Sequence, residues 1–257
     1  MPAKSVAKLA FHLMKDYPQV LETTSIPSKI FREGTPDAIK MDNWNFMLPE
    51  LVYAYKGAKV DGLKTGTTDF AGHCFTGTAE KDGLRVISVV MKAVDSEGVG
   101  SYKARFDATA ALFNYGFAQF AKEEIVPGGY EFKEQKDINV IKGKEDKVGI
   151  AVKEPIEMVI KSSEKELYTP KLVLDEKKVK DGSIEAAIKK GEVVGHVELV
   201  KAEGKDYGYI NGTKKSSEVV TTEAVERANW FSLGLQAVGH FFGNLWSGAT
   251  DFVGGLF

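Results

Sequence analysis

A Lys-Thr-Gly tripeptide at residues 64–66 constrains this chain more than any other feature, because it lies where one extended segment meets the next. Lys81-Asp82-Gly83 is a tight-turn signal, and a run rich in Val and Ile follows it at 84–91. We therefore predict three antiparallel strands, one through Lys64, one over 72–79 and one over 84–91.

Each residue type in this tripeptide suits the binding of a peptide-like anion. The amine of Lys64 places a cation on the strand, and the hydroxyl of Thr65 can donate a hydrogen bond to a carboxylate. Gly66 leaves its strand face free of a side chain, so a substrate can approach as an added strand. The backbone N–H of Thr67 could stabilise an oxyanion. The alternative to a binding role is an ordinary strand end followed by a turn.

Along the rest of the chain, the sequence pattern changes at two points. Apolar residues at helical spacing predict helices over 3–16 and 101–121. From about residue 123 to 222, short β-branched runs between Gly, Pro and Lys-Asp signals predict a separate small β-domain. These runs lie at 138–141, 148–152, 193–200 and 207–210.

The last segment, 223–257, reads as an amphipathic helix with an aromatic face. That face could pack on a partner or on its own domain, or it could lie in a membrane interface. Gly residues and Asp251 argue against a transmembrane span, and we favour the membrane-surface interpretation. The residues expected to insert are Trp230, Phe231, Phe241, Phe242, Trp246 and Phe252.

Composition excludes several classes of protein. Hydrophobic residues make up 43% of the 257 positions, which is enough for a packed core. The net charge of −2 argues against a nucleic-acid-binding protein. One cysteine, Cys74, excludes an internal disulfide framework, and the four histidines show no metal spacing. We expect neither a metal nor another cofactor.

The run Asp61-Gly62-Leu63-Lys64-Thr65-Gly66-Thr67-Thr68 and the hairpin and Arg-bearing helix after it resemble the low-molecular-mass penicillin-binding proteins, and within them the D-alanyl-D-alanine carboxypeptidases. The resemblance extends over nearly the whole chain. It implies an α+β fold: a partial penicillin-binding/β-lactamase-like antiparallel sheet with helices at 1–122, a small all-β sandwich-like domain at 123–222, and an amphipathic membrane-anchoring helix at 223–257.

By this resemblance, Lys64, Thr65 and Gly66 form the third active-site box of a serine-type peptidase. Thr67 supplies the oxyanion N–H, and Arg105 orients the substrate's terminal carboxylate together with Thr65. The implied activity removes the terminal D-alanine from peptidoglycan stem pentapeptides through an acyl-serine. β-Lactam antibiotics would inhibit the intact enzyme at the same serine.

The two upstream boxes of that family have no credible counterpart in this sequence. No Ser-x-Asn occurs, and the two Ser-x-x-Lys matches begin at Ser5, too close to Lys64, and at Ser162, downstream of it. We expect the chain to be inactive alone, with a separate fragment completing the site in trans as an intermediate possibility. The alternative function is a catalytically dead, membrane-anchored fragment or binding module.

The N-terminus has no apolar signal core, and we expect the natural protein to extend upstream of it. The intact protein would then lie on the extracytoplasmic face of the bacterial cell membrane. We also expect the 84–91 strand to present a bare sheet edge, and the first domain to be poorly stable in isolation.

Overall fold

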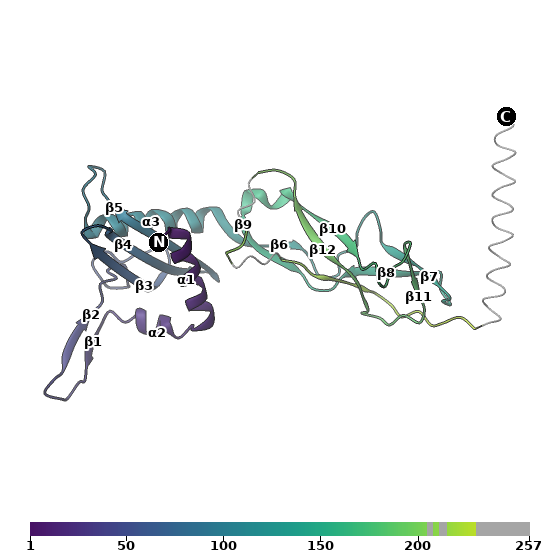
Figure 1. Cartoon of the computed structure of the whole chain (residues 1–257), viewed down its shortest axis with the longest axis horizontal. Helices are drawn as coiled ribbons and strands as arrows, with labels where there is room; N and C mark the ends of the chain where they lie inside the picture. The colour runs from purple at the N-terminus through teal and green to yellow at the C-terminus, as the bar shows by residue number, and fades with distance from the viewer. Residues whose placement is uncertain (205–207, 211–214, 230–257) are drawn as a thin grey trace. The chain divides into compact units, whose positions relative to one another are not determined.

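The computed structural model describes residues 1–204, 208–210 and 215–229, and Figure 1 traces them. They form two compact units. The first holds residues 1–123, 159–165 and 208–210, and the second holds the other described residues. The three-part domain division stays a prediction, because most of its last part, 223–257, lies outside the described residues.

The first unit is built on a three-stranded antiparallel sheet in the order β3-β4-β5. β3 covers Lys59–Thr68, β4 covers Gly72–Lys81 and β5 covers Leu84–Ala93, which confirms the three predicted strands. Asp82 and Gly83 join β4 to β5 with positive φ angles of 51° and 76°, as a type I′ hairpin requires. β5 pairs with β4 alone among the described strands, so it is the expected edge strand.

One helix covers one face of this sheet. α3, Tyr102–Gln119, begins at Ser101, whose Oγ accepts a hydrogen bond from the backbone N–H of Ala104 at 3.1 Å. Phe106 and Phe113 of α3 are buried in a cluster with Phe75 of β4. The predicted helix over 101–121 is confirmed, except that its last residues enter β6.

The other face of the sheet is covered by α1, Ala3–Asp16, and α2, Val20–Thr24 (Figure 1). α1 contacts β4 and β5 and buries Ala10 and Met14, which confirms the helix predicted over 3–16. α2 lies directly against β3, where a Cβ atom at Gly62 would be 2.9 Å from the hydroxyl of Thr24. The part of β3 around Gly62 is therefore packed closely against α2.

A short hairpin that the sequence did not indicate projects from the first unit (Figure 1). Its strands are β1, Ser28–Phe31, and β2, Ile39–Asp42, and every residue in both is exposed. Because neither strand has a buried face, no alternation of apolar and polar residues marks it.

The second unit is an all-β domain, as predicted. Its six-stranded sheet has the order β10-β12-β13-β8-β7-β11. The strands β6 and β9 form a separate pair, and each of them has residues in both units. The strands are β6 Phe120–Val126, β7 Asp137–Ile141, β8 Lys147–Val152, β9 Ile156–Lys161, β10 Tyr168–Leu174, β11 Ser183–Glu185, β12 Val193–Lys201 and β13 Glu218–Thr221, with a 3-10 turn η1 at Ser162–Leu167. Three of the four predicted runs are strands; the fourth, 207–210, is not a strand over its described residues 208–210.

Candidate functional site

The Lys-Thr-Gly residues occupy the second half of β3. Thr65 pairs with Phe75 of β4, and Gly66 pairs with Cys74. Thr65 is buried, whereas Lys64 and Gly66 are exposed. A Cβ atom at Gly66 would meet no other atom within 4 Å, so this part of β3 is open to an approaching molecule. The unpaired edge of β3 among the described strands could take an added strand.

The amine of Lys64 hydrogen-bonds the backbone carbonyl of Thr65 at 2.5 Å. It forms no ion pair with any carboxylate of the described residues. Its positive charge therefore stays uncompensated on an exposed part of the strand, where it can act on a bound anion.

Arg105 is the most unusual side chain of the first unit. It lies in the first turn of α3, is only 1% exposed, and stacks between Tyr102 and Phe106, with its guanidinium carbon 4.9 Å from each ring centroid. Its Nη1 donates a hydrogen bond to Oγ1 of Thr67 at 3.2 Å. Its Nε and Nη2 are buried and have no hydrogen-bond partner among the described residues.

Burial lowers the pKa of Arg105, and the nearby Tyr102 and Cys74 offset this effect. An arginine nevertheless stays charged in proteins. The guanidinium is therefore a buried cation that forms no ion pair with a carboxylate in the part of the chain that the structure describes. A buried donor that lacks an acceptor carries a free-energy cost of about 1–3 kcal/mol, and more when it is charged. Such a group gains strongly when an anion supplies the missing acceptor.

Because side chains alternate between the two faces of a strand, the predicted site residues of β3 lie on two different faces. Thr65 and Thr67 face the α3 side with Phe75 and His73, their partners on β4, whereas Lys64 lies on the opposite face. Arg105 was expected to act with Thr65, and the hydrogen bond present is to Thr67, two residues further along the same face. Both hydroxyls therefore lie on the side of the strand that Arg105 approaches.

Two aromatic residues and one histidine beside Arg105 were not among the predicted site residues. The His73 ring lies 4.8 Å from that of Tyr102, and its Nδ1 is 3.3 Å from Oγ1 of Thr67. The Trp44 ring lies 6.2 Å from that of Tyr102 and is 59% exposed. The hairpin register, which sets His73 opposite Thr67, is the signal that could have found the histidine.

The Asn43-Trp44-Asn45 segment holds β3 against α2. The side-chain amide of Asn43 donates to the carbonyls of Thr24 and Ile26, at 3.0 Å each. Asn45 is buried, and its amide donates to the carbonyl of Gly62 at 3.3 Å. These side chains are occupied with the backbone, which fixes the position of the strand that carries the site.

An ion pair connects the N-terminal part of β3 to β5. Both oxygens of the buried Asp61 carboxylate accept hydrogen bonds from Arg85 of β5, at 2.8 and 2.9 Å. This contact raises the pKa of Arg85. Arg85 of β5 thereby connects all three strands. Asp61 lies in β3, and the side chain of Thr78 in β4 accepts a third hydrogen bond from Arg85.

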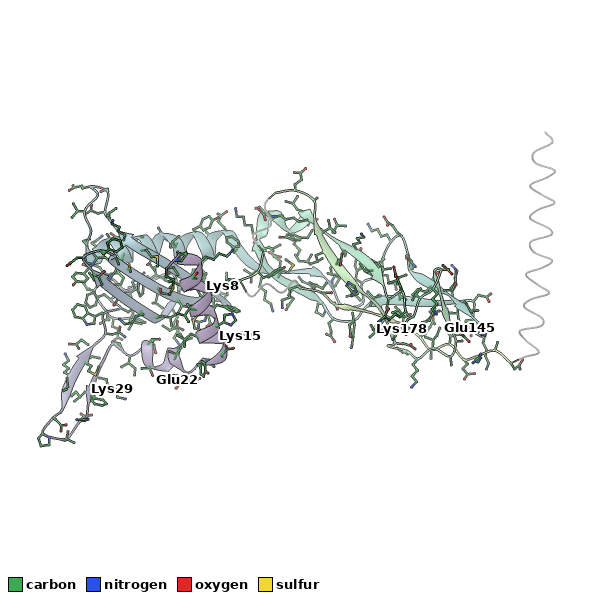
Figure 2. All side chains as sticks on the ribbon, in the orientation of Figure 1. Lys8, Lys15, Glu22, Lys29, Glu145 and Lys178 are labelled. Carbon is green, nitrogen blue, oxygen red and sulfur yellow. The ribbon has the colours of Figure 1, made fainter. Side chains whose placement is uncertain are left out.

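The two Ser-x-x-Lys matches lie away from these residues. Ser5 is exposed near the start of α1, and Lys8 of the same match projects from that helix (Figure 2). Ser162 is exposed in η1, where Lys165 pairs with Glu123 at 3.1 Å. α1 packs on β4 and β5, and the helix that packs on β3 is α2.

Other expectations concern residues beyond this site. The aromatic residues at 230–252 that were expected to insert into a membrane lie outside the described residues. Within the described part of the chain, no helix combines the length and the apolar character needed to cross a bilayer. The same part holds no cluster of three or more potential metal-binding side chains.

Comparison with known proteins gives matches along most of the chain. Residues 1–95 match the D-alanyl-D-alanine carboxypeptidase family, and residues 120–227 match the C-terminal domain of penicillin-binding protein 5. The chain is 28% identical over 211 residues to D-alanyl-D-alanine carboxypeptidase DacA of Haemophilus influenzae, covering 81% of this chain and 47% of the relative. It is 30% identical over 199 residues to the DacF enzyme of Bacillus subtilis, covering 77% and 46%.

Solved structures give the same result. The crystal structure of a peptidoglycan synthesis regulatory factor (PBP3) from Streptococcus pneumoniae is 32% identical, with a TM-score of 0.57 over 87% of this chain and 56% of that chain. Penicillin-binding protein 5 from Haemophilus influenzae is 26% identical, with a TM-score of 0.52 over 84% and 54%. The chain thus spans about half the length of the relatives it matches.

Proposed function

This chain belongs to the D-alanyl-D-alanine carboxypeptidases among the low-molecular-mass penicillin-binding proteins, and we propose that it forms the carboxylate-binding side of such an active site. The substrate is the D-alanyl-D-alanine end of a peptidoglycan stem peptide. The intact enzyme removes the terminal D-alanine through an acyl-serine.

One observation carries this proposal: Arg105 is a buried cation with two unpartnered donors, adjacent to the hydroxyl of Thr67. A C-terminal carboxylate supplies the two acceptor oxygens that a guanidinium fork matches. Thr65, on the same face of β3, adds a hydroxyl donor to that carboxylate. Phe106 and Tyr102 hold the guanidinium plane in place.

The remaining parts of β3 have roles that follow from their placement. Gly66 lets the peptide backbone of the substrate approach the strand, because no atom lies where its Cβ would be. The backbone N–H of Thr67 stabilises the oxyanion of the tetrahedral intermediate. Lys64 supplies a positive charge that favours the anionic substrate and the serine's ionised form.

We propose that the chain alone does not catalyse the reaction, because neither Ser5 nor Ser162 is placed to attack a peptide held on β3. Ser5 is exposed on α1, which packs on β4 and β5, and Ser162 is exposed in η1. On this proposal β-lactams acylate only the intact enzyme. A chain with a substrate-binding strand and no nucleophile would serve as a binding module, or would act with a polypeptide that supplies the serine.

Calorimetric titration of the purified chain tests the binding proposal. Nα-acetyl-D-alanyl-D-alanine should bind more tightly than its C-terminal carboxamide, which has the same backbone but no charge. Arg105→Gln should remove that preference, and Lys103→Gln, an exposed change on the same helix, should keep it. Equal affinity for acid and carboxamide in the unmodified chain would contradict the proposal.

We also propose that the segment 223–257 attaches the protein to the outer surface of the bacterial membrane through its aromatic face. The support is the sequence pattern that includes Trp230 and Trp246. Sedimentation with phosphatidylglycerol–phosphatidylethanolamine vesicles should recover the full chain but not a chain ending at Ala228. Equal recovery of both chains would contradict this attachment.

A further inference from the structure

The hydroxyl of Thr67 is shared by two side chains with opposite hydrogen-bonding needs. It accepts a hydrogen bond from Nη1 of Arg105 at 3.2 Å, and Nδ1 of His73 lies 3.3 Å from the same oxygen. Because a hydroxyl has one hydrogen, the state of the His73 ring decides where that hydrogen points. The three side chains come from α3, β3 and β4.

We propose that His73 is a positioning residue of the carboxylate site, whose protonation turns the Thr67 hydroxyl towards the bound carboxylate. In the neutral tautomer that carries its hydrogen on Nε2, Nδ1 accepts the Thr67 hydrogen, so the hydrogen bonds run from Arg105 through Thr67 to His73. In the protonated ring, Nδ1–H donates to Oγ1 instead. The Thr67 hydrogen is then released and can be donated to the substrate.

The charges around His73 decide the direction of this effect. The Tyr102 ring on α3 lies 4.8 Å from that of His73, and Arg105 of the same helix bonds the Thr67 hydroxyl that His73 approaches. Cys74 is the neighbour of His73 on β4. Lys92 of β5 packs along Gly72, the residue before His73. No carboxylate of the described residues forms an ion pair with the His73 ring. A carboxylate bound beside Arg105 and Thr67 would add an anion to these surroundings.

Binding and protonation are therefore coupled, which is an inference that rests on the proposed function. A carboxylate next to Arg105 and Thr67 favours the protonated His73 ring, and by linkage the protonated ring favours the carboxylate. Affinity for a C-terminal carboxylate should rise as the pH falls through the range where an imidazole titrates, about pH 7.5 to 5.5. The peptide carboxyl group itself stays ionised over that range, since its ordinary pKa is about 3.5.

The first arm of the test measures the affinity of the full chain for Nα-acetyl-D-alanyl-D-alanine at pH 5.5 and pH 7.5. We expect binding about fivefold tighter at the lower pH, at the small end of ordinary coupling between two sites. His73→Phe, which keeps a ring beside Tyr102, should remove the pH dependence. His196→Phe, on β12 of the other unit, should keep it.

The second arm needs no variant and follows the ring Cε1–Hε1 signals of the histidines by NMR during pH titration. Saturation with the acid peptide should move the titration midpoint of His73 to higher pH and leave those of His12 and His196 in place. The carboxamide peptide should move none of them. A midpoint of His73 that does not move under bound acid peptide would overturn the inference.

The outcomes separate this inference from the proposed function. If the chain prefers the acid peptide to the carboxamide but does so equally at both pH values, the carboxylate site stands and the role of His73 is wrong. If the acid preference is absent at both pH values, the proposed function fails and the coupling fails with it.

Discussion

Arg105 and Thr67 are joined by a single hydrogen bond of 3.2 Å between Nη1 and Oγ1, across 38 positions of the sequence. This contact connects the first turn of α3 to the open end of β3. It satisfies one nitrogen of the guanidinium, whereas Nε and Nη2 stay buried with no acceptor from residues 1–204, 208–210 or 215–229. A group built only to stabilise the fold would have those donors satisfied. The arrangement therefore favours a ligand as the missing acceptor.

Arg105→Met should separate stability from binding. Removing a buried charge with unmet donors should raise the free energy of unfolding by about 1 kcal/mol, while acid-peptide binding is lost. Urea denaturation of the two proteins measures the first effect, and calorimetry measures the second. A loss of stability of that size or larger would mean that Arg105 serves the fold instead.

Gly66→Val should weaken binding without weakening the fold. The position is open, and Val suits a strand better than Gly, so stability should be unchanged or rise by up to about 1 kcal/mol. The added side chain blocks the approach of a peptide backbone, and we expect about tenfold weaker binding of Nα-acetyl-D-alanyl-D-alanine, equivalent to about 1.4 kcal/mol.

Lys59→Val is the matched control for this substitution, because Lys59 is exposed at the other end of β3. Its affinity for the same peptide should equal that of the unmodified chain. Equal affinities of all three proteins would show that no substrate lies over Gly66.

Asp61→Asn should destabilise the first unit. The side chain of Asp61 is 8% exposed and holds Arg85 with two hydrogen bonds, so the change leaves a half-buried guanidinium with Glu80 as its remaining carboxylate. We expect a loss of about 2 kcal/mol in the free energy of unfolding, less than for a fully buried pair. Glu80→Gln, at a side chain 47% exposed, should cost under about 0.5 kcal/mol. Similar losses in both variants would contradict a special role for Asp61.

The bare edge of β5 should make the chain self-associate. Met91 lies on this strand and is 41% exposed, and a lysine on an exposed edge strand opposes pairing with a second copy. Met91→Lys should therefore lower the concentration-dependent light scattering of the purified chain. Val200→Lys is the control, because Val200 is similarly exposed on β12, which has a partner on each side. Equal scattering by both variants would place the contact elsewhere.

Incubation with a fluorescent penicillin, followed by a denaturing gel and intact-mass measurement, should give no covalent adduct with the folded chain. Neither serine lies on β3: Ser5 is exposed on α1, which packs on β4 and β5, and Ser162 is exposed in η1. An adduct that Ser5→Ala abolishes would make Ser5 the nucleophile and refute the inactivity of the chain.

Much of the first unit could be predicted because its elements have one buried face. The three strands and both long helices follow from apolar spacing and from the Asp82-Gly83 turn. The β1–β2 hairpin could not, because all of its residues are exposed and nothing buried imposes a period. Phe120 fits the apolar stripe of α3 but caps it and starts β6, where the chain turns extended.

The residue types of the candidate site stand out in the sequence, whereas the contacts between them do not. Lys64, Thr65, Gly66 and Arg105 are recognisable from the sequence, but that Arg105 bonds Thr67 depends on where α3 begins relative to β3. His73 was not among the predicted site residues. Its place beside Thr67 follows from the β3–β4 register, which is known only once the hairpin is built.

The most direct test of the carboxylate site observes the Nε–Hε signal of Arg105 itself by NMR, assigned by its loss in Arg105→Lys. Adding Nα-acetyl-D-alanyl-D-alanine to the full chain should shift that signal downfield, as a donor that gains a carboxylate acceptor does, and the carboxamide peptide should leave it in place. A signal that responds to neither peptide, or equally to both, would contradict the assignment of Arg105 as the receptor for the substrate's terminal carboxylate.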